Sequence, residues 1–312
     1  MTTRTRNQAL STADVVRQTL NGRRVDLGTF VFEWLLLLAL VITIGLLVVL
    51  LVSVVTDGLP VFADRGTDFL TANLASSPER AGIAQGIVGS LLLMVFVVLI
   101  SFPIGIGAAV YLEEYAKDTW LTRLVNTVIR NLAGVPAIVY GLLGLAIFVG
   151  ALGGLTGGRS VISGGLTLAV LVLPIVIITT AEALRAVPMT IREAAFGVGA
   201  TRWETVRSHV LPYAAPGIFT GTILSLARAF GETAPLIVVG AIAGTFRYTA
   251  HGIVDQLQGP YTALPTIIFG FSRDPDSGFR AATAAAIIVL LVVLLSVNAL
   301  AIFLRNRFER RW

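Results

Sequence analysis

Apolar residues occur in long runs along this chain, separated by shorter polar segments. Six of these runs are free or nearly free of charge, and each exceeds the roughly 20 residues that a helix needs to cross a bilayer. They cover residues 34–55, 81–112, 131–158, 160–181, 208–246 and 281–304. The pattern therefore predicts an all-α integral membrane protein with six transmembrane helices. An even number of spans places both termini on the same side of the membrane.

Composition supports a membrane protein and excludes other classes. Of the 312 residues, 55% are hydrophobic and 13% are charged, and the mean hydropathy is +0.85. A soluble domain could not cover so much apolar surface with so few charges, and a disordered chain is polar and highly charged. The chain contains no cysteine, which excludes disulfide frameworks, cysteine zinc sites and thiol catalysis.

The distribution of basic residues predicts the orientation. A net charge of +5 and a pI near 10.1 would suggest nucleic-acid binding in a soluble protein. Here, however, sixteen of the 23 arginines and lysines fall at the termini and in the loops after the second and fourth spans, against six on the opposite side. The positive-inside rule then makes both termini cytoplasmic. Residues 1–33 and 305–312 are predicted cytoplasmic segments, residues 34–55 the first membrane helix, and the expected partner is the lipid bilayer rather than nucleic acid.

Several catalytic and nucleotide-binding motifs are absent from the sequence. There is no GxxxxGK[ST] segment, so the chain cannot hold ATP with a P-loop, and there is neither HExxH nor GxSxG. The two histidines, His209 and His251, are predicted on opposite sides of the membrane, so they cannot share a metal ion. No aspartate lies inside a predicted span, which argues against a membrane hydrolase. We expect no enzymatic activity, cofactor or metal, although another subunit can still power transport.

The predicted cytoplasmic loop 185–211 contains the sequence EAAFGVGATRWETVRSHVLP at residues 193–212. Its pattern predicts a short helix, a glycine turn, and a second helix that Thr201 and Glu204 cap and that ends before Pro212. Trp203 and Val206 are three residues apart and form an apolar ridge flanked by arginines. Such a ridge can dock a partner protein, or the helix can lie flat on the lipid headgroups.

One predicted span contains two opposite charges, Arg228 and Glu232. They are four residues apart, which would place them on one face of a helix. The pair can be structural, neutralising itself within the membrane and fixing helix packing. Alternatively it faces a pathway, where Arg228 offers hydrogen-bond donors to an oxyanion. Gly231 and Pro235 flank the pair, so the helix can loosen here.

Two other segments have more than one interpretation. The segment PYTALPTIIFGF, at residues 260–271, is apolar but too short to cross the membrane, which favours an interfacial or re-entrant segment. Glu113 and Glu114 follow the second span and are either a second cytoplasmic contact or part of a solvated turn. Their position favours the solvated turn.

The loop also resembles the EAA motif of ABC importer permeases. Six positions fit the motif, and His209 stands where the family favours isoleucine. These positions are Glu193, Ala194, Ala195, Gly199, Leu211 and Pro212. The resemblance implies a type I ABC importer permease core over residues 81–304. It also implies that the loop, including Trp203, sits in a cleft of an ATPase subunit and transmits its closure.

A second resemblance concerns the substrate. The phrase RAFGETAPL, at residues 228–236, is similar to the signature of phosphate-specific ABC permeases, and AAVYLEEYA (108–116) and NLAGVPAIVYGLLGL (131–145) fit the same group. The GETAP segment is closer to the PstA-type subunit than to the PstC-type. The resemblance implies a permease subunit of an ATP-driven phosphate importer in a bacterial plasma membrane. Its implied partners are a PstC-type permease, two PstB-type ATP-binding subunits and an extracytoplasmic PstS-type phosphate-binding protein.

Three alternatives remain open at the level of sequence. An ABC permease could carry another oxyanion, such as molybdate or sulfate. A stand-alone proton-coupled carrier could use Glu232 for its proton. A membrane scaffold would transport nothing, and it would have no need of charges inside a span.

Overall fold

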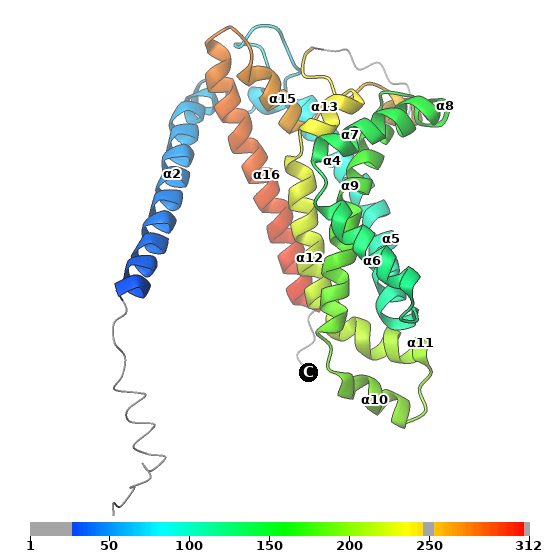
Figure 1. Cartoon of the computed structure of the whole chain (residues 1–312). Helices are drawn as coiled ribbons and strands as arrows, with labels where there is room; N and C mark the ends of the chain where they lie inside the picture. Colours follow the sequence, from blue (N-terminus) through cyan, green and yellow to red (C-terminus); the bar gives the residue numbers. More distant parts are fainter. Residues whose placement is uncertain (1–26, 246–252, 309–312) are drawn as a thin grey trace, which may run out of the picture. The chain divides into compact units, whose positions relative to one another are not determined.

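The computed structural model describes residues 27–245 and 253–308, and every regular element in these ranges is a helix (Figure 1). The chain divides into two units, residues 1–53 and 54–312, which are described separately below. The predicted cytoplasmic segment 1–33 and tail 305–312 lie partly outside the described residues. Their assignment to the cytoplasm therefore stays a prediction.

The described part of the first unit is a single apolar helix. Helix α2 runs from Leu27 to Arg65, so it extends beyond the predicted span 34–55 at both ends. Every residue from 27 to 53 is exposed in this chain. A helix that is hydrophobic on all sides needs an apolar environment, which agrees with a membrane span.

The second unit is built on four long helical rods. The first rod joins α4 (Ala84–Phe96), α5 (Phe102–Val110) and two π-helical segments, η1 (Val97–Ser101) and η2 (Tyr111–Tyr115). The second rod is α9 (Val161–Arg185). The third joins α11 (Arg202–Thr205), the π-helical segment η4 (Val206–Val210) and α12 (Leu211–Gly231), and the fourth is α16 (Gly278–Phe308).

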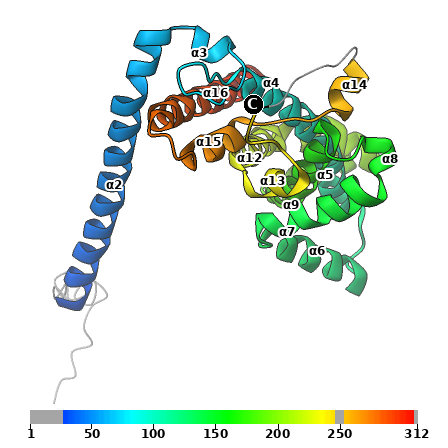
Figure 2. The same cartoon turned by 90° about the horizontal axis from the view of Figure 1, so that it is seen from above.

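Helix α9 occupies the centre of this unit. It contacts the first rod along α4, η1 and α5, and it contacts α12 on another side (Figure 2). Most of its residues are buried, and Ser160 caps its N-terminus by accepting a hydrogen bond from the Ser163 amide. Small residues allow the close packing: an added Cβ at Gly105 of α5 would meet Val176, and one at Gly221 of α12 would meet Thr179.

Two of the helices in this unit have a π-helical turn just before a proline. The segment η1 ends two residues before Pro103, and η4 ends two residues before Pro212. Proline lacks an N–H group and clashes with the carbonyl four residues earlier, and a π-helical turn is one way a helix can absorb the distortion. The prediction that the second loop helix ends before Pro212 is therefore wrong, because the helix runs on to Gly231.

The predicted third span is not one straight helix. Helix α6 (Trp120–Ala133) ends at Gly134, and α7 (Ala137–Gly144) continues into the π-helical segment η3 (Leu145–Ala151). The two parts are bent by 103° relative to each other. Pro136 explains the break, since the residue before a proline disfavours the helical conformation. Within the described residues, five helices are long and apolar enough to span a membrane, or six if the bent pair is one span.

Short helices complete the second unit. They are α3 (Asp68–Thr71), α8 (Gly153–Thr156), α10 (Met189–Gly197), α13 (Ala234–Val239), α14 (Ile253–Gln258) and α15 (Leu264–Ser272). Helix α15 forms within the apolar segment 260–271 and packs against α4 and α16. Residues 261–267 are buried in the main hydrophobic core, so protein surrounds this segment. This burial contradicts the interfacial interpretation of segment 260–271.

The two ends of the unit carry different parts. Figure 1 shows α10 and α11 at one end of the long helices, and α13 and α15 near the other. The larger hydrophobic core lies around α15 and includes Phe69, Leu236 and Phe279. A smaller one lies near the loop and includes Leu184 and Val210.

Candidate functional site

The two charges of the predicted fifth span lie where α12 ends. Arg228 is in the last turn of α12, and Glu232 caps the helix with an extended backbone (φ −77°, ψ 119°). The Nε atom of Arg228 lies 3.4 Å from Oε1 of Glu232. The prediction of one shared helix face is wrong, because the helix ends at Gly231, but the two side chains still form an ion pair. The expected loosening at Gly231 is present as a complete break before α13.

Helix α12 has one packed face and one open face at this end. Thr222, Ser225, Leu226 and Ala229 are buried against the rest of the unit. Positions 220, 224, 228 and 231 follow helical spacing and are exposed. The side chain of Arg228 is 48% exposed and that of Glu232 is 20% exposed. Arg228 therefore points away from the packed interior of this chain.

The broken end of α12 lies beside the other broken helix. Helix α13, which follows Glu232, packs against α7. The contact is close, since an added Cβ at Gly141 would lie 2.8 Å from the Cα atom of Pro235. Across the bend between α6 and α7, the hydroxyl of Tyr140 donates a hydrogen bond of 2.9 Å to the carbonyl of Leu132. Two interrupted helices thus meet next to Arg228, and interruptions of this kind free backbone groups within a membrane.

The loop that is predicted to be cytoplasmic has the expected arrangement of helix, glycine turn and helix. Helix α10 ends in a Schellman turn: the Gly199 amide donates to the Phe196 carbonyl, and the Ala200 amide donates to the Ala195 carbonyl. Gly199 has a φ of +86°, a conformation that other residues adopt at a cost. Thr201 and Glu204 then form the predicted capping box at the start of α11.

The predicted coupling residues of this loop differ in exposure. Glu193, Ala194, Gly199, Trp203 and Pro212 are exposed, Leu211 is half-buried, and Ala195 is buried. Val206 is only 1% exposed, so the predicted ridge of Trp203 and Val206 does not exist as a surface. The exposed apolar side chains around the loop are instead Met189, Phe196, Val198 and Trp203.

The two predicted sets of site residues are not brought together. The loop lies at the end of α12 where the helix begins, and Arg228 lies in its last turn (Figure 1). The same continuous helix, which begins at Arg202, connects the two regions. Any communication between them must pass along α12 or through the helices packed against it.

The interpretation of Glu113 and Glu114 as part of a solvated turn is wrong. Glu113 binds Arg185 at the end of α9, and Glu114 binds Arg192 of α10. Sequence reasoning missed both pairs, since the partners are 72 and 78 residues apart. A weak signal was present, because the two acidic residues and the four arginines of loop 185–211 are predicted on the same side of the membrane.

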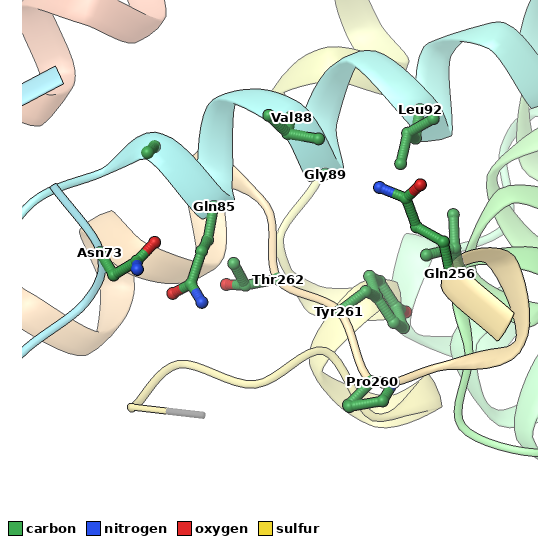
Figure 3. A pocket seen from close by; sticks show the side chains of 11 residues that line it. Asn73, Gln85, Val88, Gly89, Leu92, Gln256, Pro260, Tyr261 and Thr262 are labelled. Carbon is green, nitrogen blue, oxygen red and sulfur yellow. The ribbon is translucent and has the colours of Figure 1, made fainter. Parts of the chain in front are cut away.

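A pocket of about 260 Å³ lies near the start of α4 (Figure 3). Amide and hydroxyl side chains line it together with apolar ones, and none of the lining residues is charged; the polar set is Asn73, Gln85, Gln256, Tyr261 and Thr262. Burial raises the pKa of the Tyr261 hydroxyl above its usual value, so this group stays neutral. A desolvated phosphate is compensated by positive charge or by hydrogen-bond donors. The pocket offers donors but no positive charge, in contrast to the surroundings of Arg228.

Comparison with known proteins supports the fold and identifies the family. A family model for the inner membrane component of binding-protein-dependent transport systems matches residues 101–312. The phosphate transport system permease protein PstA of Yersinia pestis is 34% identical over 265 residues, which are 84% of this chain and 85% of that protein. The protein of the same name from Mycobacterium leprae (strain TN) is 33% identical over 287 residues, covering 90% of this chain and 89% of the relative.

A solved structure is similar in fold alone. A chain of a bacterial alginate ABC transporter, crystallised in complex with a periplasmic protein bound to alginate pentasaccharide, superposes with a TM-score of 0.62. The match covers 91% of this chain and 98% of that chain at 15% identity. The predicted all-α, type I ABC importer permease-like fold is confirmed. The chain is a multi-pass membrane protein, and it belongs to the family of binding-protein-dependent transport system inner membrane components.

Proposed function

We propose that this chain is the PstA-type permease subunit of an ATP-driven importer of inorganic phosphate. One observation carries the proposal: the guanidinium of Arg228 lies on the open face of α12, beside two interrupted helices, and Glu232 is its one ion-pair partner within residues 27–245 and 253–308. An anion that leaves water must be compensated by positive charge or by hydrogen-bond donors. The names of the two relatives support phosphate as that anion.

Arg228 and Glu232 have complementary roles in this proposal. The planar guanidinium offers a fork of donors that matches the oxygens of a phosphate. Glu232 pairs with Arg228 when no anion is present, so the charge is never left uncompensated. Competition from the carboxylate also weakens the hold on phosphate, and transport requires that a bound ion can leave. The exposed position of Arg228 suits a pathway shared with a second permease.

The energy for transport comes from partner subunits in this proposal. The sequence has no P-loop, so ATP hydrolysis belongs to two PstB-type subunits. Loop 185–211 docks to them with its exposed apolar side chains, which Glu193 and other charges surround. A PstC-type permease completes the pathway, and an extracytoplasmic PstS-type protein delivers phosphate.

The alternatives predict different requirements. A proton-coupled carrier would work without an ATPase and would respond to a pH gradient. A scaffold would need no arginine on an open helix face. A permease for molybdate or sulfate would share the site but select another oxyanion. Family membership argues against the carrier and the scaffold, because the family consists of components of transport systems that depend on a binding protein.

The direct test is uptake by the reconstituted complex. Proteoliposomes with both permeases and the ATPase are supplied with the binding protein, internal ATP and labelled phosphate. We expect ATP-dependent phosphate uptake that a large excess of sulfate or molybdate does not reduce. Uptake without the ATPase, or preferential uptake of sulfate or molybdate, would contradict the proposal.

A second test addresses the docking surface. Glu193 is exposed and has no ion-pair partner among the described residues. Glu193→Lys should therefore leave the fold intact but prevent copurification of the ATPase. Glu79→Lys is the matched control, since Glu79 is also exposed but lies at the opposite, predicted outer end. If the ATPase is recovered equally with both variants, the loop is not part of the docking surface.

A further inference from the structure

Three consecutive residues at the end of the first long rod each contact an arginine of the loop region. They are Glu113, Glu114 and Tyr115, in the π-helical segment η2. Their partners come from three different elements: Arg185 from the end of α9, Arg192 from α10 and Arg202 from α11. We call these three residues and their three arginines the loop clamp. The rod 84–115 is not continuous in sequence with the loop. It is attached to the loop by side-chain contacts, which are the clamp and the smaller hydrophobic core that Ala109 shares with Val187 and Ile191.

The central contact of the clamp is a buried ion pair. Nη2 of Arg192 lies 2.7 Å from Oε1 of Glu114, and the side chains are only 14% and 9% exposed. The same guanidinium donates hydrogen bonds of 2.8 Å to the Val187 carbonyl and 3.0 Å to the Leu184 carbonyl. Arg192 thus joins α10, the end of α9 and η2 in one network. Separating such a pair would leave a charge buried without its partner.

Two outer contacts flank the buried pair. Arg185 binds Glu113 with two hydrogen bonds, one of them 2.9 Å from Nε to Oε2. The guanidinium of Arg202 lies 5.8 Å from the centre of the Tyr115 ring, in a cation–π arrangement. Arg185 is half exposed, so its pair with Glu113 is screened by water and weaker than the buried one.

The clamp has a mechanical consequence for any movement of the loop. Helices α9 and α12 are attached to the loop by the chain itself, but the rod 84–115 is attached through side chains. A largely buried pair with additional hydrogen bonds moves as a unit more readily than it separates. A displacement of α10 therefore carries the end of η2 with it.

We propose that Glu114 and Arg192 are positioning residues that transmit movement of the loop to the rod 84–115. The pair stays closed through the transport cycle, so that the rod moves with α9 and α12 as one body when the ATPase closes. This inference rests on the proposed function in one respect, namely that an ATPase moves the loop. Neither Glu114 nor Arg192 belongs to the EAA motif, which indicated the docking surface.

The absence of natural cysteines allows a sharp test in the complete complex. Glu114→Cys and Arg192→Cys are combined, partner subunits are made free of reactive cysteine, and a short bifunctional thiol reagent joins the two positions. Before cross-linking, the phosphate transported per ATP hydrolysed should fall about fivefold, within the range over which single sites alter coupling. Copurification of the ATPase should not change. After cross-linking, the ratio should return to that of the unaltered complex.

The matched control is the ion pair of Asp118 and Arg123, which lies just beyond η2 and does not involve the loop. The double variant Asp118→Cys/Arg123→Cys should behave like the unaltered complex with and without reagent. The inference is overturned if cross-linking of positions 114 and 192 stops transport, because the two segments must then separate. An unchanged transport ratio before cross-linking would overturn it as well.

A readout without phosphate separates this inference from the proposed substrate. The cross-linking yield of positions 114 and 192 is compared in the nucleotide-free and vanadate-trapped complex. Equal yields support a clamp that stays closed, and a loss of yield in the trapped state contradicts it. If the unaltered complex hydrolyses ATP but imports no phosphate, the proposed substrate is wrong. The cross-linking yields of positions 114 and 192 still show whether the clamp stays closed.

Discussion

The guanidinium of Arg228 lies 3.4 Å from the carboxylate of Glu232, although α12 ends between these two residues. A pair within a regular helix would be held by its backbone. Here Glu232 follows the break and has an extended backbone, so the distance between the charges depends on the geometry of a turn. Such a pair can open and close with small rearrangements, which suits an arginine that alternates between a carboxylate and an incoming anion.

Arg228→Lys tests whether the shape of the cation matters. Lysine keeps the charge but lacks the planar fork of donors. Loss of one hydrogen bond to a charged group costs about 1.5–3 kcal/mol. We therefore expect phosphate uptake to fall roughly tenfold to hundredfold, while the recovered complex stays the same. Initial uptake rates at limiting phosphate provide the measurement, and an unchanged rate would show that charge alone is sufficient.

Gly199→Ala tests the turn of the predicted cytoplasmic loop. No atom outside the turn lies within 4 Å of an added Cβ, so the effect reports backbone strain alone. A non-glycine residue in the left-handed conformation costs about 1–2 kcal/mol. If the turn must be kept for docking, the affinity for the ATPase should fall roughly fivefold to thirtyfold.

Gly197→Ala is the control for this measurement. Gly197 ends the same helix, is equally open, and does not have a positive φ. Its replacement should leave the affinity for the ATPase unchanged, because alanine favours the helical conformation. Equal affinities for both variants would mean that the loop does not need the turn when it docks.

Gly89→Ala tests the packing of the buried segment before α15. An added Cβ at Gly89 would collide with the carbonyl oxygen of Thr262. Overpacking of this kind costs about 1–3 kcal/mol, so the thermal unfolding temperature in detergent should fall. Gly107→Ala, also in a membrane helix but with open space around it, should leave that temperature unchanged or raise it. If the unfolding temperature falls by a similar amount for both variants, the effect comes from replacing a glycine in a helix and not from contact with Thr262.

Local signals in the sequence predicted some features well, and the reason is physical. The capping box of Thr201 and Glu204 and the turn at Gly199 depend on residues within one or two helical turns. The span pattern depends on composition over about 20 residues. Both were therefore predicted without knowledge of the fold.

Other features depend on contacts between distant segments. The partners of Glu113 and Glu114 come from α9 and α10, and no local pattern specifies them. Val206 fits an exposed ridge by spacing, yet it is buried, and the segment η4 that contains it contacts α10. Pro212 ends a helix in isolation, but the π-helical turn before it lets the helix continue. In the first two cases tertiary packing overrides a local preference, and in the third the geometry of the helix itself does so.

The double variant Arg228→Gln/Glu232→Leu tests the central claim most directly. It removes both charges together, so neither is left without its partner, and a purely structural pair can be replaced in this way with little loss of stability. The measurement is ATP-dependent uptake of labelled phosphate by the reconstituted complex, with the recovered subunits quantified in parallel. The account predicts a complex that assembles fully and imports no phosphate. Uptake at the rate of the unaltered complex would contradict it.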